Sequence, residues 1–129
     1  MRTIIIAAFV LLNISLHAQN NQTTQHDSIP ATIIGGQDAW RHFLEKNIHS
    51  QTPADHGAKP GTYTVIVSFL VDTTGKVSDV QIINDPGYGT AKDVLNAFKH
   101  CPDWTPATIN GKAVKYRQKQ NIYYQVSEQ

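Results

Sequence analysis

The sequence predicts an α+β fold, with a three-stranded antiparallel sheet and two helices packed on one of its faces. Apolar residues recur at three- and four-residue steps in segments 37–48 and 90–101, which is the spacing of amphipathic helices. They alternate with polar residues in segments 63–72, 77–83 and 114–126, as in strands. The order is therefore helix, strand, strand, helix, strand. Because each helix has a single apolar stripe and the strands have mixed outer faces, we expect both helices on the same side of the sheet.

Residues 1–18 are predicted to be a secretory signal peptide. Arg2 supplies a positive charge, residues 3–12 form an apolar run, and Ala18 is a small residue at the expected cleavage point. The alternative is an uncleaved inner-membrane anchor through residues 3–16. This run is shorter than the roughly 20 apolar residues that span a bilayer, and it contains an asparagine. We therefore expect a periplasmic or secreted protein.

Residues 19–33 are predicted to be a flexible leader before a single domain at 34–126. The first part of the leader is rich in Gln, Asn and Thr and has no periodicity. Residues 29–34 are more apolar, so an extended segment packed against the domain is the alternative there. A length of 129 residues also favours one domain.

The first helix is predicted at residues 37–48, where Trp40, Phe43, Leu44 and Ile48 form one apolar stripe. The loop that follows contains two prolines and leads into the first strand. A hairpin turn is then expected at Asp72-Thr73-Thr74-Gly75, because Asp72 can accept hydrogen bonds from the turn amides and Gly75 suits a left-handed backbone.

The return strand at 77–83 breaks its alternation after Val77, so a β-bulge is expected near Ser78 and Asp79. Thr90 and Asp93 resemble a capping box at the start of the second helix. The apolar stripe of this helix consists of Ala91, Val94, Leu95, Phe98 and Cys101.

The connection from the second helix to the last strand is the most distinctive stretch of the chain. Pro102 is expected to end the helix, since proline disfavours helix in the residue before it. Trp104 lies between two prolines and is predicted to be a core anchor, with a ligand-stacking residue as the alternative. Asn110-Gly111 predicts a tight turn before the strand. The residues predicted to have structural roles are Trp104, Pro102, Pro106, Gly111 and Gly75.

Composition argues against several classes of function. The formal net charge of +1 gives no case for nucleic-acid binding, and the single cysteine excludes an internal disulfide. The six histidines are scattered without metal-ligand spacing, and no phosphate-binding loop is present. We expect no cofactor and no enzymatic activity. A small hydrolase that uses Cys101 beside His100 is the remaining catalytic alternative, although Cys101 lies on an apolar stripe.

The motif Pro-x-Trp-x-Pro-Ala at 102–107, followed by Asn-Gly-Lys at 110–112 and a valine-led strand, resembles the TonB C-terminal domain. Residues 34–48 are similar to the opening helix of Bacteroidota-type members of that family, and residues 61–77 resemble its first hairpin. The resemblance implies the same architecture. It also implies a periplasmic binding module that engages the short TonB-box segment of outer-membrane receptors.

The last strand is the predicted binding site, since an open sheet edge can add an extended peptide through backbone hydrogen bonds. A basic cluster on its outer face would attract acidic residues of the partner, the alternative being a solvated strand face. A self-pairing scaffold, in which two copies form a homodimer through this edge, is the other hypothesis. The predicted partner-binding residues are Lys115, Arg117, Lys119, Asn121 and Tyr123.

Overall fold

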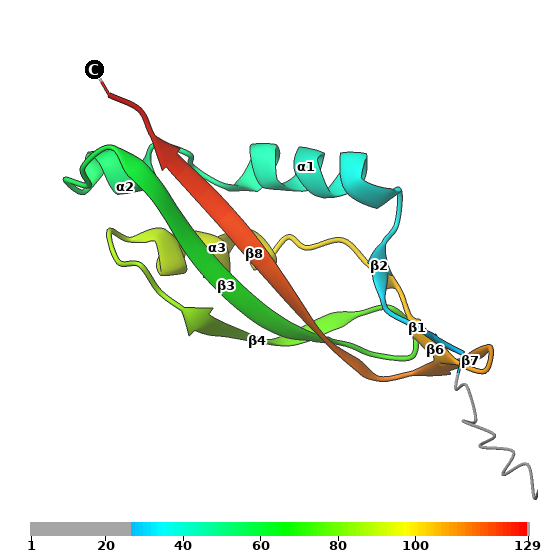
Figure 1. Cartoon of the computed structure of the whole chain (residues 1–129). Helices are drawn as coiled ribbons and strands as arrows, with labels where there is room; N and C mark the ends of the chain where they lie inside the picture. The colour runs from blue at the N-terminus through cyan, green and yellow to red at the C-terminus, as the bar shows by residue number, and fades with distance from the viewer. Residues whose placement is uncertain (1–26, 129) are drawn as a thin grey trace, which may run out of the picture.

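The computed structural model describes residues 27–128 and confirms the predicted α+β fold (Figure 1). The main sheet has the order β4-β3-β8, and both strand pairs are antiparallel. Helices α1 and α3 lie on one face of this sheet, and the short helix α2 follows α1. The bounds of these elements are α1 Gly36–Asn47, α2 Thr52–Asp55, β3 Gly61–Val71, β4 Val77–Asn84, α3 Thr90–Phe98 and β8 Tyr116–Val126.

Five short strands form two further small sheets that the sequence did not predict. One has the order β1-β6-β7 and the other pairs β2 with β5. Their bounds are β1 Ser28–Ile29, β2 Thr32–Ile33, β5 Trp104–Thr105, β6 Ala107–Ile109 and β7 Lys112–Val114.

Residues 28–33 belong to the folded domain rather than to a flexible leader. Ala31 and Ile33 are only 4% and 7% exposed and are part of the hydrophobic core. Strand pairing and apolar burial together offset the entropy lost when this segment is ordered. The predicted signal peptide and the rest of the predicted leader lie outside the described residues.

The core lies between the inner face of the sheet and the two helices. Val65, Val67, Phe69 and Val71 alternate along β3 and are fully buried, which fits the two-residue period of a strand. Ser68 on the opposite face is also buried, at 3% exposure. The helices contribute apolar side chains that include Trp40, Phe43, Val94, Ala97 and Phe98.

Trp104 is 3% exposed and lies at the centre of an aromatic cluster. Its ring centroid is 5.7 Å from that of Trp40 and 5.1 Å from that of Phe69, in both cases with an edge-to-face tilt. Trp104 therefore joins α1 to the central strand from a position in β5, where it also pairs with Ile33. This is the environment of a core anchor rather than of a ligand platform.

Three details of the second helix differ from the expectation. Leu95 is 39% exposed, so it does not belong to the buried stripe. The helix ends at Phe98, and hydrogen-bonded turns continue as far as Cys101, directly before Pro102. Thr90 is the first helical residue rather than the cap, and its hydroxyl donates to the carbonyl of Gly87 at 2.7 Å.

The last strand, predicted at 114–126, is interrupted near its start. β7 ends at Val114 and β8 begins at Tyr116, with Lys115 between them. β6 and β7 are joined by the predicted Asn110-Gly111 turn, in which both residues have positive φ, 51° and 79°. The chain therefore makes an additional hairpin before it enters the main sheet.

The turn between β3 and β4 is built around the carboxylate of Asp72. Its Oδ1 accepts hydrogen bonds from the amide of Thr74 at 2.8 Å, the hydroxyl of Thr74 at 2.6 Å and the amide of Lys76 at 3.0 Å. The Thr74 hydroxyl, followed by the two amides, lowers the pKa of Asp72, because all of these bonds favour the charged carboxylate.

Asp72→Ala is expected to destabilise the domain more at neutral pH than in acid. Because the pKa of Asp72 is lower in the folded than in the unfolded chain, its carboxylate stabilises the fold above the unfolded pKa of about 3.9. This contribution is lost as the pH falls through the folded pKa. Urea unfolding of both proteins across this range measures the difference, and a difference that is independent of pH would contradict the expectation.

Candidate functional site

The strand β8 is an edge of the main sheet along its whole length. All 11 of its residues pair with β3, from Tyr116 opposite Val71 to Val126 opposite Gly61. Within the described residues 27–128, no strand pairs with its other side. The amides and carbonyls that point to this side are therefore available to another extended chain.

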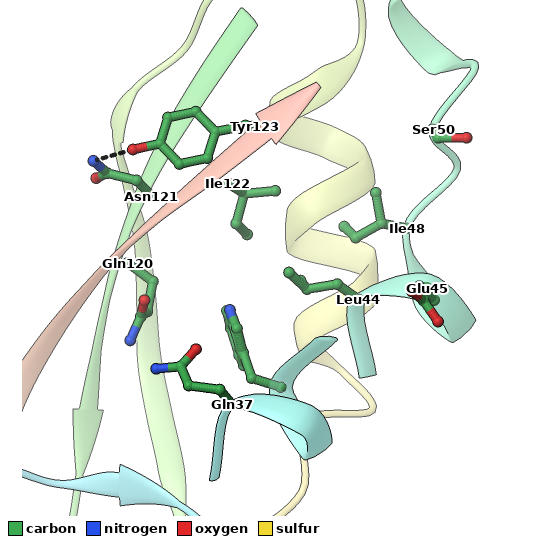
Figure 2. A pocket seen from close by; sticks show the side chains of 10 residues that line it. Gln37, Leu44, Glu45, Ile48, Ser50, Gln120, Asn121, Ile122 and Tyr123 are labelled. Atoms are coloured by element: carbon green, nitrogen blue, oxygen red, sulfur yellow. Dashed lines mark hydrogen bonds between the residues drawn. The ribbon is translucent and has the colours of Figure 1, made fainter. Parts of the chain in front are cut away.

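A groove of about 580 Å³ lies between this edge and helix α1 (Figure 2). Figure 2 shows Ile122 of β8 pointing toward Leu44 and Ile48 across the groove. The groove combines an apolar floor with polar groups at its rim. Its lining residues are Gln37, Trp40, Leu44, Glu45, Ile48, Ser50, Gln120, Asn121, Ile122 and Tyr123.

A second hollow of about 260 Å³ continues the groove toward β2. It shares Gln37, Trp40 and Gln120 with the first, and Gln118 of β8 also lines it. The two hollows together follow β8 from residue 118 to residue 123. An extended peptide beside β8 would therefore lie over a continuous groove rather than on a flat surface.

The helical periodicity of α1 produces the opposite wall. Gln37, Trp40 and Leu44 are spaced by three or four residues, so they follow one side of the helix, and Ile48, directly after α1, continues this spacing. The sequence predicted most of this stripe but assigned it to the core. Leu44 and Ile48 are only half-buried, because the sheet ends at β8 and leaves them without a strand to cover them.

Asp93 forms hydrogen bonds with three residues that are close in the sequence to residues lining the groove. Its Oδ2 accepts hydrogen bonds from the hydroxyl of Tyr124 at 2.8 Å, the amide of His49 at 3.0 Å and the hydroxyl of Thr52 at 3.3 Å. Burial, reinforced by the bond to Asp93, raises the pKa of Tyr124. The carboxylate thus connects α3, β8 and the segment after α1. The capping-box prediction assigned Asp93 a different role, because these partners are distant in the sequence.

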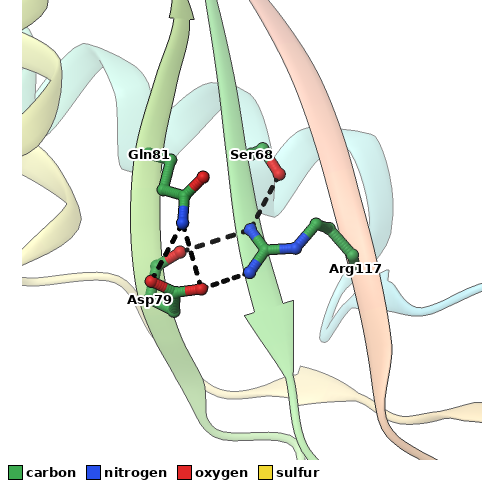
Figure 3. Close-up of polar contacts among 4 residues, drawn as sticks. All are labelled: Ser68, Asp79, Gln81 and Arg117. Carbon is green, nitrogen blue, oxygen red and sulfur yellow. Dashed lines mark hydrogen bonds and ion pairs between the residues drawn. The ribbon is translucent and has the colours of Figure 1, made fainter.

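Arg117, which we predicted as a partner-binding residue, binds side chains of the neighbouring strands instead (Figure 3). Its guanidinium group forms an ion pair with Asp79 of β4 and donates to the hydroxyl of Ser68 at 2.9 Å. Gln81 donates to the same carboxylate at 3.2 Å, and Gln81 together with Arg117 lowers the pKa of Asp79. Arg117 therefore spans the outer face of the sheet from β8 across β3 to β4.

A bulge in β4 makes this contact geometrically feasible. Ser68 is opposite Gln81, whereas Leu70 is opposite Ser78, so β4 has one extra residue between these two pairs. Asp79 lies in this bulge with a positive φ of 48°. The bulge that the sequence predicted is present, and it turns the carboxylate toward Arg117.

The other four predicted partner-binding residues are exposed, but they do not form one cluster. Lys115 lies in the break before β8, whereas Lys119 is within the strand. Asn121 and Tyr123 line the groove rim, and the amide of Asn121 donates to the hydroxyl of Tyr123 at 3.2 Å. Tyr123 is 62% exposed. Lys119, Asn121 and Tyr123 therefore form an exposed row beside the free edge.

Within residues 27–128, no three His, Cys, Asp or Glu side chains are grouped so that they could hold a metal ion. Cys101 is half-buried, and burial raises the pKa of its thiol, which disfavours the nucleophilic thiolate. In the same part of the chain, no helix has the length and apolar character needed to cross a bilayer.

The family described as "Gram-negative bacterial TonB protein C-terminal" matches residues 61–126, which is just over half of the 129-residue chain. The chain belongs to this family. TonB C-terminal domains are non-enzymatic domains of energy transduction and binding, they interact with outer-membrane receptors, and they are in general periplasmic. The family match supports a TonB-like function in transport. Neither the curated proteins nor the solved structures contain a match to this chain.

The matched segment of this TonB C-terminal domain runs from β3 to β8. It contains the whole main sheet, α3 and the Trp104 connection. Helix α1, which forms the opposite wall of the groove, lies outside it. The family match therefore covers the β8 wall of the groove but not the α1 wall.

Proposed function

We propose that this domain is a periplasmic module that binds an extended segment of a TonB-dependent outer-membrane receptor, the TonB box. The segment would lie beside β8 as a fourth strand of the sheet. The observation that supports this most strongly is the open 11-residue edge of β8, which directly borders a groove of about 580 Å³. Backbone hydrogen bonds to the edge would provide affinity, and side chains in the groove would provide specificity.

The two edges of the sheet are not equivalent, and β8 is the better acceptor. The pairing of β3 with β4 has two register irregularities, and the positive φ of Asp79 lies within one of them. Such bulges twist an edge and interrupt its row of hydrogen-bonding groups. The pairing of β3 with β8 continues without a break over all 11 residues. A regular edge of this length can accept a peptide over several residues.

The self-pairing scaffold remains the second candidate, because the same regular edge could accept β8 of another copy. The two functions differ in their dependence on protein concentration. A self-pairing module would sediment as a dimer at high concentration without any receptor peptide. A receptor-binding module would remain a monomer until the peptide is added.

The proposal is tested by titrating N-terminal receptor peptides into isotope-labelled protein and following its amide resonances by NMR. We expect shifts along residues 116–126 and around α1. A proline placed in β8 where the amide points to the free edge should weaken binding strongly, because it removes a donor from the new ladder. Lys119→Gln should reduce affinity only modestly, together with its salt dependence. No shifts along β8 at millimolar peptide, combined with dimer formation, would favour the scaffold instead.

A further inference from the structure

We propose that the groove beside β8 selects an added strand in which aliphatic and acidic residues alternate, and thereby decides which of its side chains face the groove. This inference rests on the proposed function, since it concerns the peptide that β8 would accept. Side chains of an extended chain point alternately to the two faces of a sheet. An added strand therefore presents one set of side chains to the groove and the other set to the outer face.

The groove side of the edge is apolar. The inward-pointing set of side chains would lie between Ile122 of β8 and two half-buried residues, Leu44 of α1 and Ile48 directly after it (Figure 2). An aliphatic side chain at this position would cover apolar surface that the fold leaves open. Glu45 is the charged residue among those that line the groove, so an acidic side chain there would meet a like charge.

The outer side of the edge has the opposite character. Lys119 is exposed on this face, next to the polar side chain of Asn121. Arg117 is already neutralised by Asp79, which leaves Lys119 as the strand's available cation among the described residues. An acidic residue of the peptide that points outward near Lys119 would be attracted to it, mostly during association.

These two preferences act on neighbouring peptide positions, so together they decide which of the peptide's side chains face the groove. If the peptide slips by one residue, every side chain moves to the other face. An alternating peptide would then place acidic groups beside Glu45 and aliphatic groups beside Lys119. Backbone hydrogen bonds alone would not distinguish the two registers, because all residues offer the same donors and acceptors.

Two synthetic peptides of the same composition test the inference on the full-length chain. In the first, Val and Glu alternate; in the second, the same residues are arranged in two blocks. We expect the alternating peptide to bind about tenfold more tightly, because only it can place all aliphatic groups in the groove. Isothermal titration calorimetry measures the affinities, and NMR shifts show whether each peptide binds at β8.

Two protein variants test whether Leu44 causes the preference for aliphatic residues and whether Lys119 causes the preference for acidic residues. Leu44→Gln should reduce the preference for an alternating Val/Glu peptide over an alternating Thr/Glu peptide, while Leu95→Gln on the exposed side of α3 should not. Lys119→Glu should reverse the preference for Val/Glu over Val/Lys, whereas Lys92→Glu on α3 should leave it unchanged. Both control residues lie outside the groove lining.

The outcomes separate the inference from the proposed function. If the alternating and block peptides bind at β8 with equal affinity, the edge accepts peptides but the groove does not select which of their side chains face it. If neither these peptides nor receptor segments shift the β8 resonances, the proposed function itself fails. A preference that Leu44→Gln leaves unchanged would also overturn the inference.

Discussion

Replacing Trp104 with alanine is expected to destabilise the domain by about 3–5 kcal/mol, the usual cost of truncating a large buried aromatic side chain. The indole is 3% exposed and contacts Trp40 and Phe69, so its loss would leave a cavity between α1 and the sheet. Since small domains are stable by only about 5–15 kcal/mol, this is a large share of the total. Chemical denaturation of both proteins measures the difference.

Trp104→Phe is the matched control for this change. The indole nitrogen is buried, and the polar neighbour it has, the thiol of Cys101, is a weak acceptor, so phenylalanine loses volume but little polar interaction. We expect a smaller loss of stability than for alanine. An unchanged melting temperature in Trp104→Ala would show that the indole is not a core anchor.

Gly75→Ala is expected to destabilise the domain by at least about 3 kcal/mol. Gly75 has a φ of 88°, and a Cβ atom there would be 2.0 Å from the backbone carbonyl oxygen of Trp104. The amide of Trp104 also donates to the carbonyl of Gly75 at 2.8 Å. The turn and the Trp104 strand would therefore have to separate, and this hydrogen bond would be lost.

Gly111→Ala separates the two causes of this effect. Gly111 has a similar φ of 79°, but a Cβ atom there would have no neighbour within 4 Å. Only the left-handed backbone opposes a side chain at this position, which costs about 1–2 kcal/mol. Equal losses of unfolding free energy in the two variants would show that the contact between Gly75 and Trp104 does not contribute.

The sequence predicted the main sheet and helices because their side-chain periodicity is local. The alternation in β3 and the stripe of α1 follow from residues that are near one another in the chain. The bulge at Asp79 was also visible, since it interrupts the alternation of a single strand. Trp104 was predicted as a core residue from its size and its two flanking prolines.

The features that the sequence did not predict depend on contacts between distant residues. β1 and β2 each have two residues, too few for a periodic pattern, and they form because β6 and β5 pair with them. The pairing of Arg117 with Asp79 spans 38 residues and removes one cation from the predicted basic cluster. The groove depends on the position of α1 relative to β8. A local sequence pattern does not predict this position.

Amide hydrogen exchange in the presence of a receptor peptide tests most directly whether β8 accepts an added strand. In the free protein, the β8 amides that point to the open edge should exchange rapidly, whereas those bonded to β3 should be protected. At saturating peptide, we expect new protection at alternate residues within 116–126 and little change at β4. If the peptide binds but no β8 amide becomes protected, or if the new protection is in β4, strand addition at β8 is wrong.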